Sequence, residues 1–341
     1  MSTLRINNIT DRLGESGPVI VGVCTVTSTG AFAVPAGDTA HRGGRGRGVF
    51  GGGKSPTNSS VLDYVEIATA GDATDFGDLF TGTYGTGSCA SATRGIFAGG
   101  FGPAIKADIS YVTISSQGGG NDFGDLRYTN YYPNTCSDST RGVFSGSYNG
   151  NGNRYTVDYI TIPSTGRSSD FGTNNSEVGL TYSGAGFASP TRGIFASGKD
   201  KPAANAYNKD IRYITIQSKG SGDHFGELAF SGSYTTGCSN STRGLVMGGS
   251  TPTKRNEIEY ITIATFGNTT DFGDMTTATS ALTSAASSTR GLNVGGQQSP
   301  SLTNTIEYVT IASTGNATNF GDLTVARSTL AGCSDVHGGL G

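Results

Sequence analysis

The chain carries a three-part signature six times in constant order, and this repeat constrains its fold more than any other feature. The first part is an Arg-Gly pair, whose arginines are Arg47, Arg94, Arg141, Arg192, Arg243 and Arg290. The second is a tyrosine in a β-branched run, at Tyr64, Tyr111, Tyr159, Tyr213, Tyr260 and Tyr308. The third is a Phe-Gly pair, at Phe76, Phe123, Phe171, Phe225, Phe272 and Phe320. The arginines recur every 47 or 51 residues, a period that indicates a solenoid or a propeller.

The pattern inside each repeat indicates strands. Residues 108–115 and 306–313 alternate apolar with polar side chains and are rich in β-branched and aromatic types, as half-buried strands are. No segment has an apolar stripe at helical spacing. Four short antiparallel strands per repeat make one blade of a β-propeller, so we expect an all-β fold. Many tight turns then explain the 55 glycines, because glycine adopts turn conformations without steric cost.

The spacing predicts seven blades, with six as the alternative. Six complete signatures give six blades. Residues 23–30 resemble a third strand, whereas residues 333–341 resemble the first two strands of a repeat, with His337 lying 47 residues beyond Arg290. We therefore expect residues 18–46 and 333–341 to form a composite blade, which would close a propeller of residues 18–341 and remove its exposed edge. Residues 1–17 would be an N-terminal arm; the alternative is a propeller of six blades with a separate N-terminal arm.

Charge and cysteine content exclude several classes of protein. A net charge of −3 over 341 residues gives no overall attraction to nucleic acid or to an anionic membrane. No run of 18 apolar residues is present, so membrane insertion is not expected. Four of the five cysteines, Cys89, Cys136, Cys238 and Cys333, take a repeat position that Ala285 and Phe187 occupy elsewhere. We therefore expect small buried core residues rather than disulfides, which suits synthesis in a reducing cytoplasm.

The sequence predicts neither an enzyme nor a cofactor or metal site. The three histidines stand in no Cys/His or Ser/His/Asp arrangement that repeats or clusters. Residues 71–78 offer three carboxylates, but a calcium loop alternates its ligands and takes more oxygens, and Asn268 and Asn316 replace the first acid in other copies. Calcium at these turns therefore stays open. Residues 42–48 look like an RNA-binding Arg-Gly-Gly box, yet their last Arg-Gly pair is the first repeat anchor.

The repeated arginines and the Phe-Gly phenylalanines are predicted to be structural anchors. The Arg-Gly turn and the Asp-Phe-Gly-Asp segment fall on the same side of a blade. A half-buried charge needs a partner. We expect each arginine to pair with an aspartate of the second segment, the candidates being Asp78, Asp125, Asp274 and Asp322. A ring of arginines that binds an anion is the alternative.

Variation in length is confined to two connections within the repeat. Tyrosine and phenylalanine are 12 residues apart in all six copies, whereas the arginine-to-tyrosine distance ranges from 17 to 21. The two variable connections, from second to third strand and from fourth strand to the next first strand, lie on the same face of an up-and-down blade. Variable loops on a rigid scaffold are typical of binding surfaces, although neutral variation would give the same pattern.

Tyrosines concentrate in these variable connections. Long connections span residues 146–156, 174–187 and 198–209, and residues 127–135 lie nearby. The candidate binding residues are Tyr131, Tyr132, Tyr148, Tyr155, Tyr182, Tyr207, Lys199 and Lys201. Tyrosine offers rigid, amphipathic contact area at low entropic cost, which suits a glycan or a protein ligand; solvated loops are the alternative.

The repeat resembles that of kelch-type propellers, which have a double glycine after the second strand and aromatic residues in the third and fourth strands. The double glycines begin at Gly52, Gly99, Gly248 and Gly295, and phenylalanine replaces the tryptophan of the kelch fourth strand. A closer resemblance is to kelch-like or RCC1-like repeat proteins among the virion structural proteins of marine tailed bacteriophages, similar to cyanophage proteins. Residues 310–323 and the start at residues 1–9 carry it.

This resemblance implies a non-enzymatic virion protein, made in the host cytoplasm and located on the particle. The propeller would be a tail-fibre-type component that recognises a glycan or protein on the host surface. The arm of residues 1–17 would attach it to other virion proteins, for instance by adding a strand to a neighbour. A capsid decoration protein anchored by the same arm and a cellular kelch-like scaffold or lectin are the alternatives.

Overall fold

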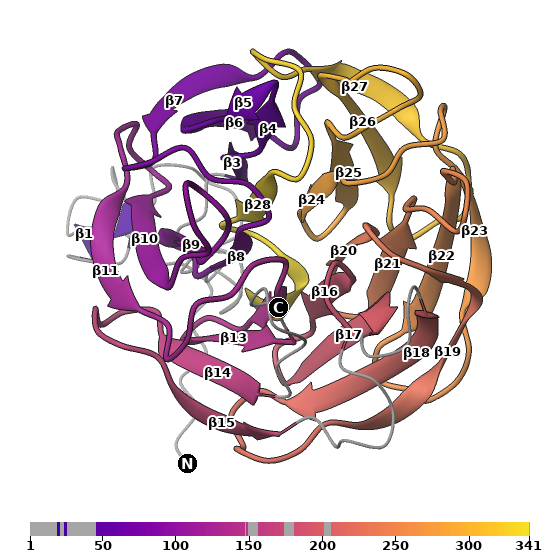
Figure 1. The fold of residues 1–341 in the computed structure, drawn as a ribbon, viewed down its shortest axis with the longest axis horizontal. Coiled ribbons are helices and arrows are strands. Elements are labelled where there is room, and N and C mark those ends of the chain that lie inside the picture. The colour runs from indigo at the N-terminus through magenta and orange to yellow at the C-terminus, as the bar shows by residue number, and fades with distance from the viewer. Residues whose placement is uncertain are drawn as a thin grey trace, which may run out of the picture. The chain divides into compact units, whose positions relative to one another are not determined.

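The computed structural model describes residues 19–20, 24–25, 46–146, 148, 156–173, 181–200 and 206–340. The chain divides into two units, residues 1–41 and 42–341. In the first unit the described residues form one antiparallel hairpin of β1 (Val19–Ile20) and β2 (Cys24–Thr25). The predicted arm of residues 1–17 lies outside the described residues. The second unit is a β-propeller (Figure 1).

Six four-stranded antiparallel sheets form the blades, which we number I to VI in chain order. The strands of each blade are given from the innermost to the outermost. Blade I is β28 (Ala331–Ser334), β3 (Arg47–Gly51), β6 (Val61–Glu66) and β7 (Thr74–Asp78). Blade II is β8 (Gly87–Ala90), β9 (Arg94–Ala98), β10 (Asp108–Thr113) and β11 (Asn121–Asp125). Blade III is β12 (Asn134–Ser137), β13 (Arg141–Ser145), β14 (Thr156–Thr161) and β15 (Ser169–Thr173).

The remaining blades keep the same order. Blade IV is β16 (Ala185–Ala188), β17 (Arg192–Asp200), β18 (Ala206–Thr215) and β19 (Asp223–Gly232). Blade V is β20 (Thr236–Ser239), β21 (Arg243–Met247), β22 (Glu257–Thr262) and β23 (Thr270–Asp274). Blade VI is β24 (Thr283–Ala286), β25 (Arg290–Val294), β26 (Thr305–Thr310) and β27 (Thr318–Asp322). A small hairpin of β4 (Lys54–Ser55) and β5 (Thr57–Asn58) follows β3.

The hydrophobic core lies between neighbouring blades. It consists of six clusters, each of which joins buried residues of one blade to those of the next. Between blades I and II, for example, Leu62 and Phe76 pack against Phe97 and Ile114. Every blade also has a bulge between its third and outer strands at the same repeat position. A bulge increases local twist, so the six bulges repeat one twisted blade shape around the axis.

The predicted number of seven blades is wrong, and the six-bladed alternative is confirmed. The C-terminal strand β28 pairs with β3, in a register that sets Ala331 opposite Gly51 and Ser334 opposite Gly48. The closing blade therefore does combine the two ends of the propeller, but with β3, β6 and β7 rather than residues 18–46, which are mostly outside the described residues.

The end of β28 shows why His337 is not a seventh repeat anchor. The Oδ1 atom of Asp335 accepts hydrogen bonds from the backbone N–H groups of Gly46 (3.1 Å) and Arg47 (2.8 Å). In blade III, Asp138, three residues before the anchor Arg141, accepts the N–H of that arginine in the same way (2.8 Å). Asp335 thus completes the turn before Arg47, although the two residues lie 288 positions apart in the sequence. The C-terminal strand β28 therefore belongs to the same blade as the first repeat.

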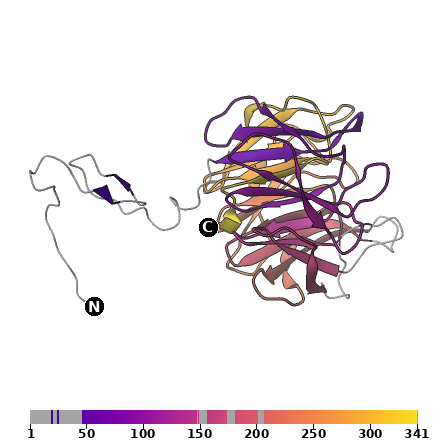
Figure 2. The same cartoon turned by 90° about the vertical axis from the view of Figure 1, so that its left-hand side faces the viewer.

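Residues after β28 cover one end of the propeller axis. His337 Nε2 lies 2.9 Å from the carbonyl oxygen of Ala90, and the N–H of Gly339 donates to His337 Nδ1 (3.1 Å). A short 3-10 helix, η1 (Gly338–Leu340), follows, and a Cβ at Gly339 would overlap the carbonyl oxygen of Ser137. In the side view η1 lies at one face of the propeller (Figure 2). Among the described residues, no helix has the length and apolar character needed to cross a membrane.

Candidate functional site

The six repeat arginines link neighbouring blades rather than point into a site. Each guanidinium carbon lies 4.3–4.8 Å from the ring centroid of the signature tyrosine of its own blade, a favourable cation–π distance. Each Nη1 also donates to an isoleucine carbonyl of the next blade at 2.6–3.2 Å. The last of these bonds, from Arg290 to Ile67, joins blade VI to blade I.

The predicted pairing of these arginines with Asp78, Asp125, Asp274 and Asp322 is wrong. Within the described part of the chain, the ion pairs include one repeat arginine, Arg47, and its partner is Glu66 at 2.7 Å. Asp78 instead accepts a hydrogen bond from Ser60 (2.9 Å). Each guanidinium therefore has a tyrosine ring and an isoleucine carbonyl oxygen as its partners, in place of the predicted carboxylate.

The other repeat markers form the interior of the blades. Each Phe-Gly phenylalanine is buried and meets its signature tyrosine edge-on, with ring centroids 5.9–6.3 Å apart. Cys89, Cys136, Cys238 and Cys333 are buried free thiols, as predicted. Burial raises the pKa of Cys238 and Cys333 to about 12. These thiols therefore stay protonated and act as core residues.

Aromatic side chains gather on the face that carries the variable connections. We define the aromatic cluster as Tyr84, Phe101, Tyr131, Tyr132, Tyr148, Tyr182 and Tyr234. Contacting rings of the cluster have centroids 4.6–6.5 Å apart; examples are the pairs Tyr131–Tyr132, Tyr131–Tyr148 and Tyr148–Tyr182. Tyr84 packs on Phe101 at 5.4 Å, and Phe101 lies 5.9 Å from Tyr131. Such offset and edge-to-face pairs stabilise one another, so the cluster forms a continuous aromatic surface across several blades.

The structure brings together four of the predicted binding tyrosines, namely Tyr131, Tyr132, Tyr148 and Tyr182. Tyr155 and Lys201 lie outside the described residues. Tyr84, Phe101 and Tyr234 were not predicted. A positional signal existed for two of these: Tyr84 lies ten residues before its repeat arginine, as Tyr131 and Tyr182 do, and Tyr234 lies nine residues before, as Tyr132 does.

Backbone pairing holds the cluster in place. Tyr131 and Tyr148 exchange two backbone hydrogen bonds of 3.1 Å, and Tyr182 and Lys199 exchange two of 3.0–3.2 Å. The connection predicted at residues 198–209 is not a loose loop at its described ends. It extends β17 and β18, with Lys199 opposite Tyr207. The cluster therefore stands on paired strands that limit its movement.

Lys199 is the predicted cation that reaches the cluster. Its Nζ lies 5.1 Å from the ring centroid of Tyr234 and 5.6 Å from that of Tyr207. Burial lowers the pKa of Lys199. Tyr207 lies beside this lysine, next to the cluster rather than within it.

A closed ring of backbone hydrogen bonds surrounds the axis beneath the cluster. One residue per blade takes part, and each N–H donates to the carbonyl oxygen of its counterpart in the preceding blade at 2.6–3.1 Å. The members are Gly85, Tyr132, Ser183, Tyr234, Ala281 and Thr329. All six have φ between 54° and 64°, a left-handed conformation that costs roughly 1 kcal/mol or more for a residue other than glycine. Such strain is typical of ligand-binding sites.

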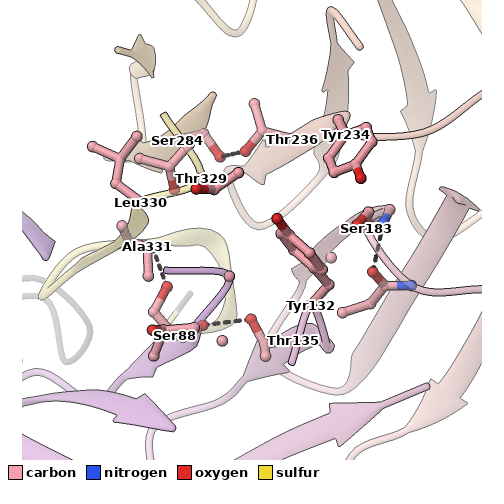
Figure 3. A pocket seen from close by; sticks show the side chains of 18 of the residues that line it. Ser88, Tyr132, Thr135, Ser183, Tyr234, Thr236, Ser284, Thr329, Leu330 and Ala331 are labelled. Atoms are coloured by element: carbon pink, nitrogen blue, oxygen red, sulfur yellow. Dashed lines mark hydrogen bonds between the residues drawn. The ribbon is translucent and has the colours of Figure 1, made fainter. Parts of the chain in front are cut away.

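An axial pocket of about 130 Å³ opens at this ring (Figure 3). Hydroxyl groups supply much of its lining, including those of Tyr132, Thr135, Ser183, Tyr234 and Ser284. No charged side chain is among the described residues that line it. Thr236 Oγ1 donates to Ser284 Oγ at 2.7 Å, and Ser284 Oγ donates to the carbonyl of Gly237 at 2.8 Å.

Burial keeps the tyrosine hydroxyls neutral. It raises the pKa of Tyr131 to about 12, with smaller contributions from the neighbouring tyrosines. It also raises the pKa of Tyr132 and Tyr234, although a hydrogen bond to Thr329 acts against this rise at Tyr132. The phenols therefore act as hydrogen-bond donors and acceptors rather than as anions.

Neither protein-family models nor curated proteins provide a match to this chain. The architecture of repeated four-stranded blades is consistent with a kelch-like or RCC1-like fold.

Proposed function

We propose that this protein is a non-enzymatic binding protein that recognises a glycan through its aromatic cluster. The observation that carries the proposal is the cluster itself, seven aromatic rings in contact on one face of a rigid propeller. Tyrosine combines an apolar ring with a polar hydroxyl, and it presents both at little cost in conformational entropy. Sugar rings, which have apolar C–H faces and hydroxyl edges, match that surface.

The pocket supports binding rather than hydrolysis. Most glycosidases use two carboxyl groups, roughly 5–10 Å apart, as acid and as nucleophile or base. The described residues that line the axial pocket include no aspartate, glutamate or histidine among their hydroxyl, glycine and small apolar neighbours. A sugar seated there would meet hydrogen-bonding groups but no pair of acids to cleave it.

The biological setting that we propose is a bacteriophage particle. Its support is the resemblance of the repeats and of the N-terminal start to virion structural proteins of marine tailed phages. In this setting the propeller is a tail-fibre-type component for host recognition, and residues 1–17 attach it to other virion proteins. Antibody labelling of intact particles tests this part separately: labelled tails support it, whereas a uniformly labelled capsid favours the decoration alternative and unlabelled particles contradict a virion location.

A glycan array tests the binding proposal. The full-length protein should bind defined surface glycans, and the double variant Tyr131→Ala/Tyr148→Ala should lose at least tenfold in affinity because it removes two adjoining rings. Phe266→Ala is the matched control. Phe266 is a large exposed aromatic, 56% accessible, in the connection between the third and outer strands of blade V, at the opposite end of the blade. Equal loss in both variants, or no glycan bound at all, would contradict the proposal.

A further inference from the structure

We infer that the axial pocket holds one uncharged sugar ring, the terminal residue of the glycan that the aromatic cluster binds. This inference rests on the proposed function and names its ligand class. Its evidence is a buried hydroxyl without a partner, a charge-free lining, a matching volume and a rigid rim to which two tyrosines of the aromatic cluster contribute.

The clearest sign of a ligand is the side chain of Ser183. This residue is 7% exposed, lines the axial pocket (Figure 3), and its Oγ has no hydrogen-bond partner in the described structure. A buried polar atom left unpaired costs about 1–3 kcal/mol. A ligand hydroxyl in the pocket would satisfy it.

The lining defines the charge of the ligand. Hydroxyl groups and backbone of all six blades face the pocket, without a charged side chain among the described lining residues. Transferring an ionised group to such a site costs far more than transferring a hydroxyl, unless an opposite charge is present. Carboxylated sugars, phosphates and amines are therefore disfavoured, and a neutral polyhydroxylated ring is favoured.

The size of the pocket fits a single ring. Its volume of about 130 Å³ is close to the roughly 150 Å³ of a protein cavity known to hold benzene. One six-membered ring can enter while its outward substituents, including the bond to the next sugar, stay at the open mouth. The far end of the axis is covered by His337 and η1, so the ligand must enter from the face of the aromatic cluster.

The rim is rigid before the ligand arrives. Tyr132 and Tyr234 stand nearly perpendicular, with ring centroids 5.6 Å apart, and both belong to the closed ring of backbone hydrogen bonds. A site that is already ordered loses little entropy on binding. The strain of left-handed residues at the rim is then explained, because it aims the side chains of Tyr132, Ser183 and Tyr234 at one small volume.

Saturation-transfer NMR on the full-length protein tests the inference. The probes are the methyl pyranosides of glucose, galactose and mannose, compared with glucuronic acid and N-acetylneuraminic acid. We expect at least one neutral pyranoside to bind and the acids to bind at least tenfold more weakly. Preference for an acidic sugar would overturn the inference and leave the glycan-binding proposal intact.

Two matched variants locate the sugar. Ser183→Gly removes the unpaired hydroxyl, and glycine suits its φ of 58°. Ser313→Gly is the control: it removes an exposed hydroxyl from the connection between the third and outer strands of blade VI, at the end of the blade away from the aromatic cluster. We expect Ser183→Gly to weaken neutral-sugar binding by roughly three- to tenfold, the worth of about one hydrogen bond, and Ser313→Gly to leave it unchanged. Equal binding by both variants would overturn the inference. The glycan-binding proposal would still stand in that case if Tyr131→Ala/Tyr148→Ala lost binding on the array.

Discussion

Arg327 and Asp63 form a wholly buried ion pair where the last blade meets the first. The Nη2 of Arg327 lies 2.8 Å from Oδ2 of Asp63, and both side chains have no exposed surface. Arg327 also donates to the carbonyls of Val61 (2.7 Å) and Phe50 (3.2 Å). Arg327 precedes β28, so this pair fastens the segment that leads into the closing strand to blade I.

Breaking this pair should destabilise the protein strongly. In Arg327→Met, Asp63 stays buried without its cation, and such a loss costs about 3–5 kcal/mol. Burial already raises the pKa of Asp63 despite the arginine. The measurement is urea unfolding followed by circular dichroism. The double variant Arg327→Met/Asp63→Asn, which leaves no charge, should recover part of the loss; a single variant within about 1 kcal/mol of the wild type would show that the pair does not hold the closure.

The glycine of the Arg-Gly pair should be needed for the close approach of neighbouring blades. A Cβ at Gly244 would overlap the ring of Phe187. We expect Gly244→Ala to lower the free energy of unfolding by about 1–3 kcal/mol, as overpacking does. Gly71→Ala is the control, because a Cβ there meets nothing within 4 Å. If both variants unfold alike, the packing explanation for this glycine fails.

His337 should make stability depend on pH. Burial lowers its pKa, against smaller opposing effects of the Ala90 carbonyl and Asp138. Since the folded-state pKa lies below the unfolded value of about 6.5, the unfolded chain takes up the proton first as the pH falls. The contribution of neutral His337 to stability is therefore present above pH 6.5 or so and is lost as the pH falls through the folded-state pKa.

The matched variant for this test is His337→Gln, which keeps a hydrogen-bond donor but cannot titrate. Thermal unfolding between pH 7.5 and 5.5 should show a growing loss of stability in the wild type relative to this variant. Burial raises the pKa of Asp63, Glu259 and Glu307. These acids therefore increase stability as the pH falls, opposite to His337, but they are common to both proteins. The exposed His224 supplies a control as His224→Gln. Parallel curves for wild type and His337→Gln would contradict the assignment.

The repeats were sufficient to predict the blade but not the number of blades. Period-two alternation and the constant tyrosine-to-phenylalanine distance are local properties, and the structure has the four strands that they indicate. Which strand pairs with β28 depends on contact between residues nearly 290 positions apart, such as Asp335 and Arg47. His337 lies 47 residues beyond Arg290, which suggested a seventh anchor. In the structure Arg47 takes the anchor position next to Asp335.

The candidate site was predictable only in part for a related reason. Spacing indicated the variable face, and four of the predicted tyrosines meet there. The predicted arginine partners were wrong because the signature tyrosine lies on the neighbouring strand of the same blade, whereas the aspartates lie on the outer strand. The guanidinium carbon of Arg243, for example, is 4.3 Å from the ring centroid of Tyr260. Five members of the left-handed ring lie nine residues before a repeat arginine, from Arg94 to Arg290. Because their side chains differ from repeat to repeat, the sequence pattern did not indicate this position.

The most direct test of the account is a crystal structure of the full-length protein with an oligosaccharide selected on the array. We expect the terminal neutral sugar to lie in the axial pocket with a hydroxyl bonded to Ser183, and the following residues to pack on Tyr131 and Tyr148. A ligand bound on the opposite face, or against the outer strands with the axial pocket holding only water, would contradict it.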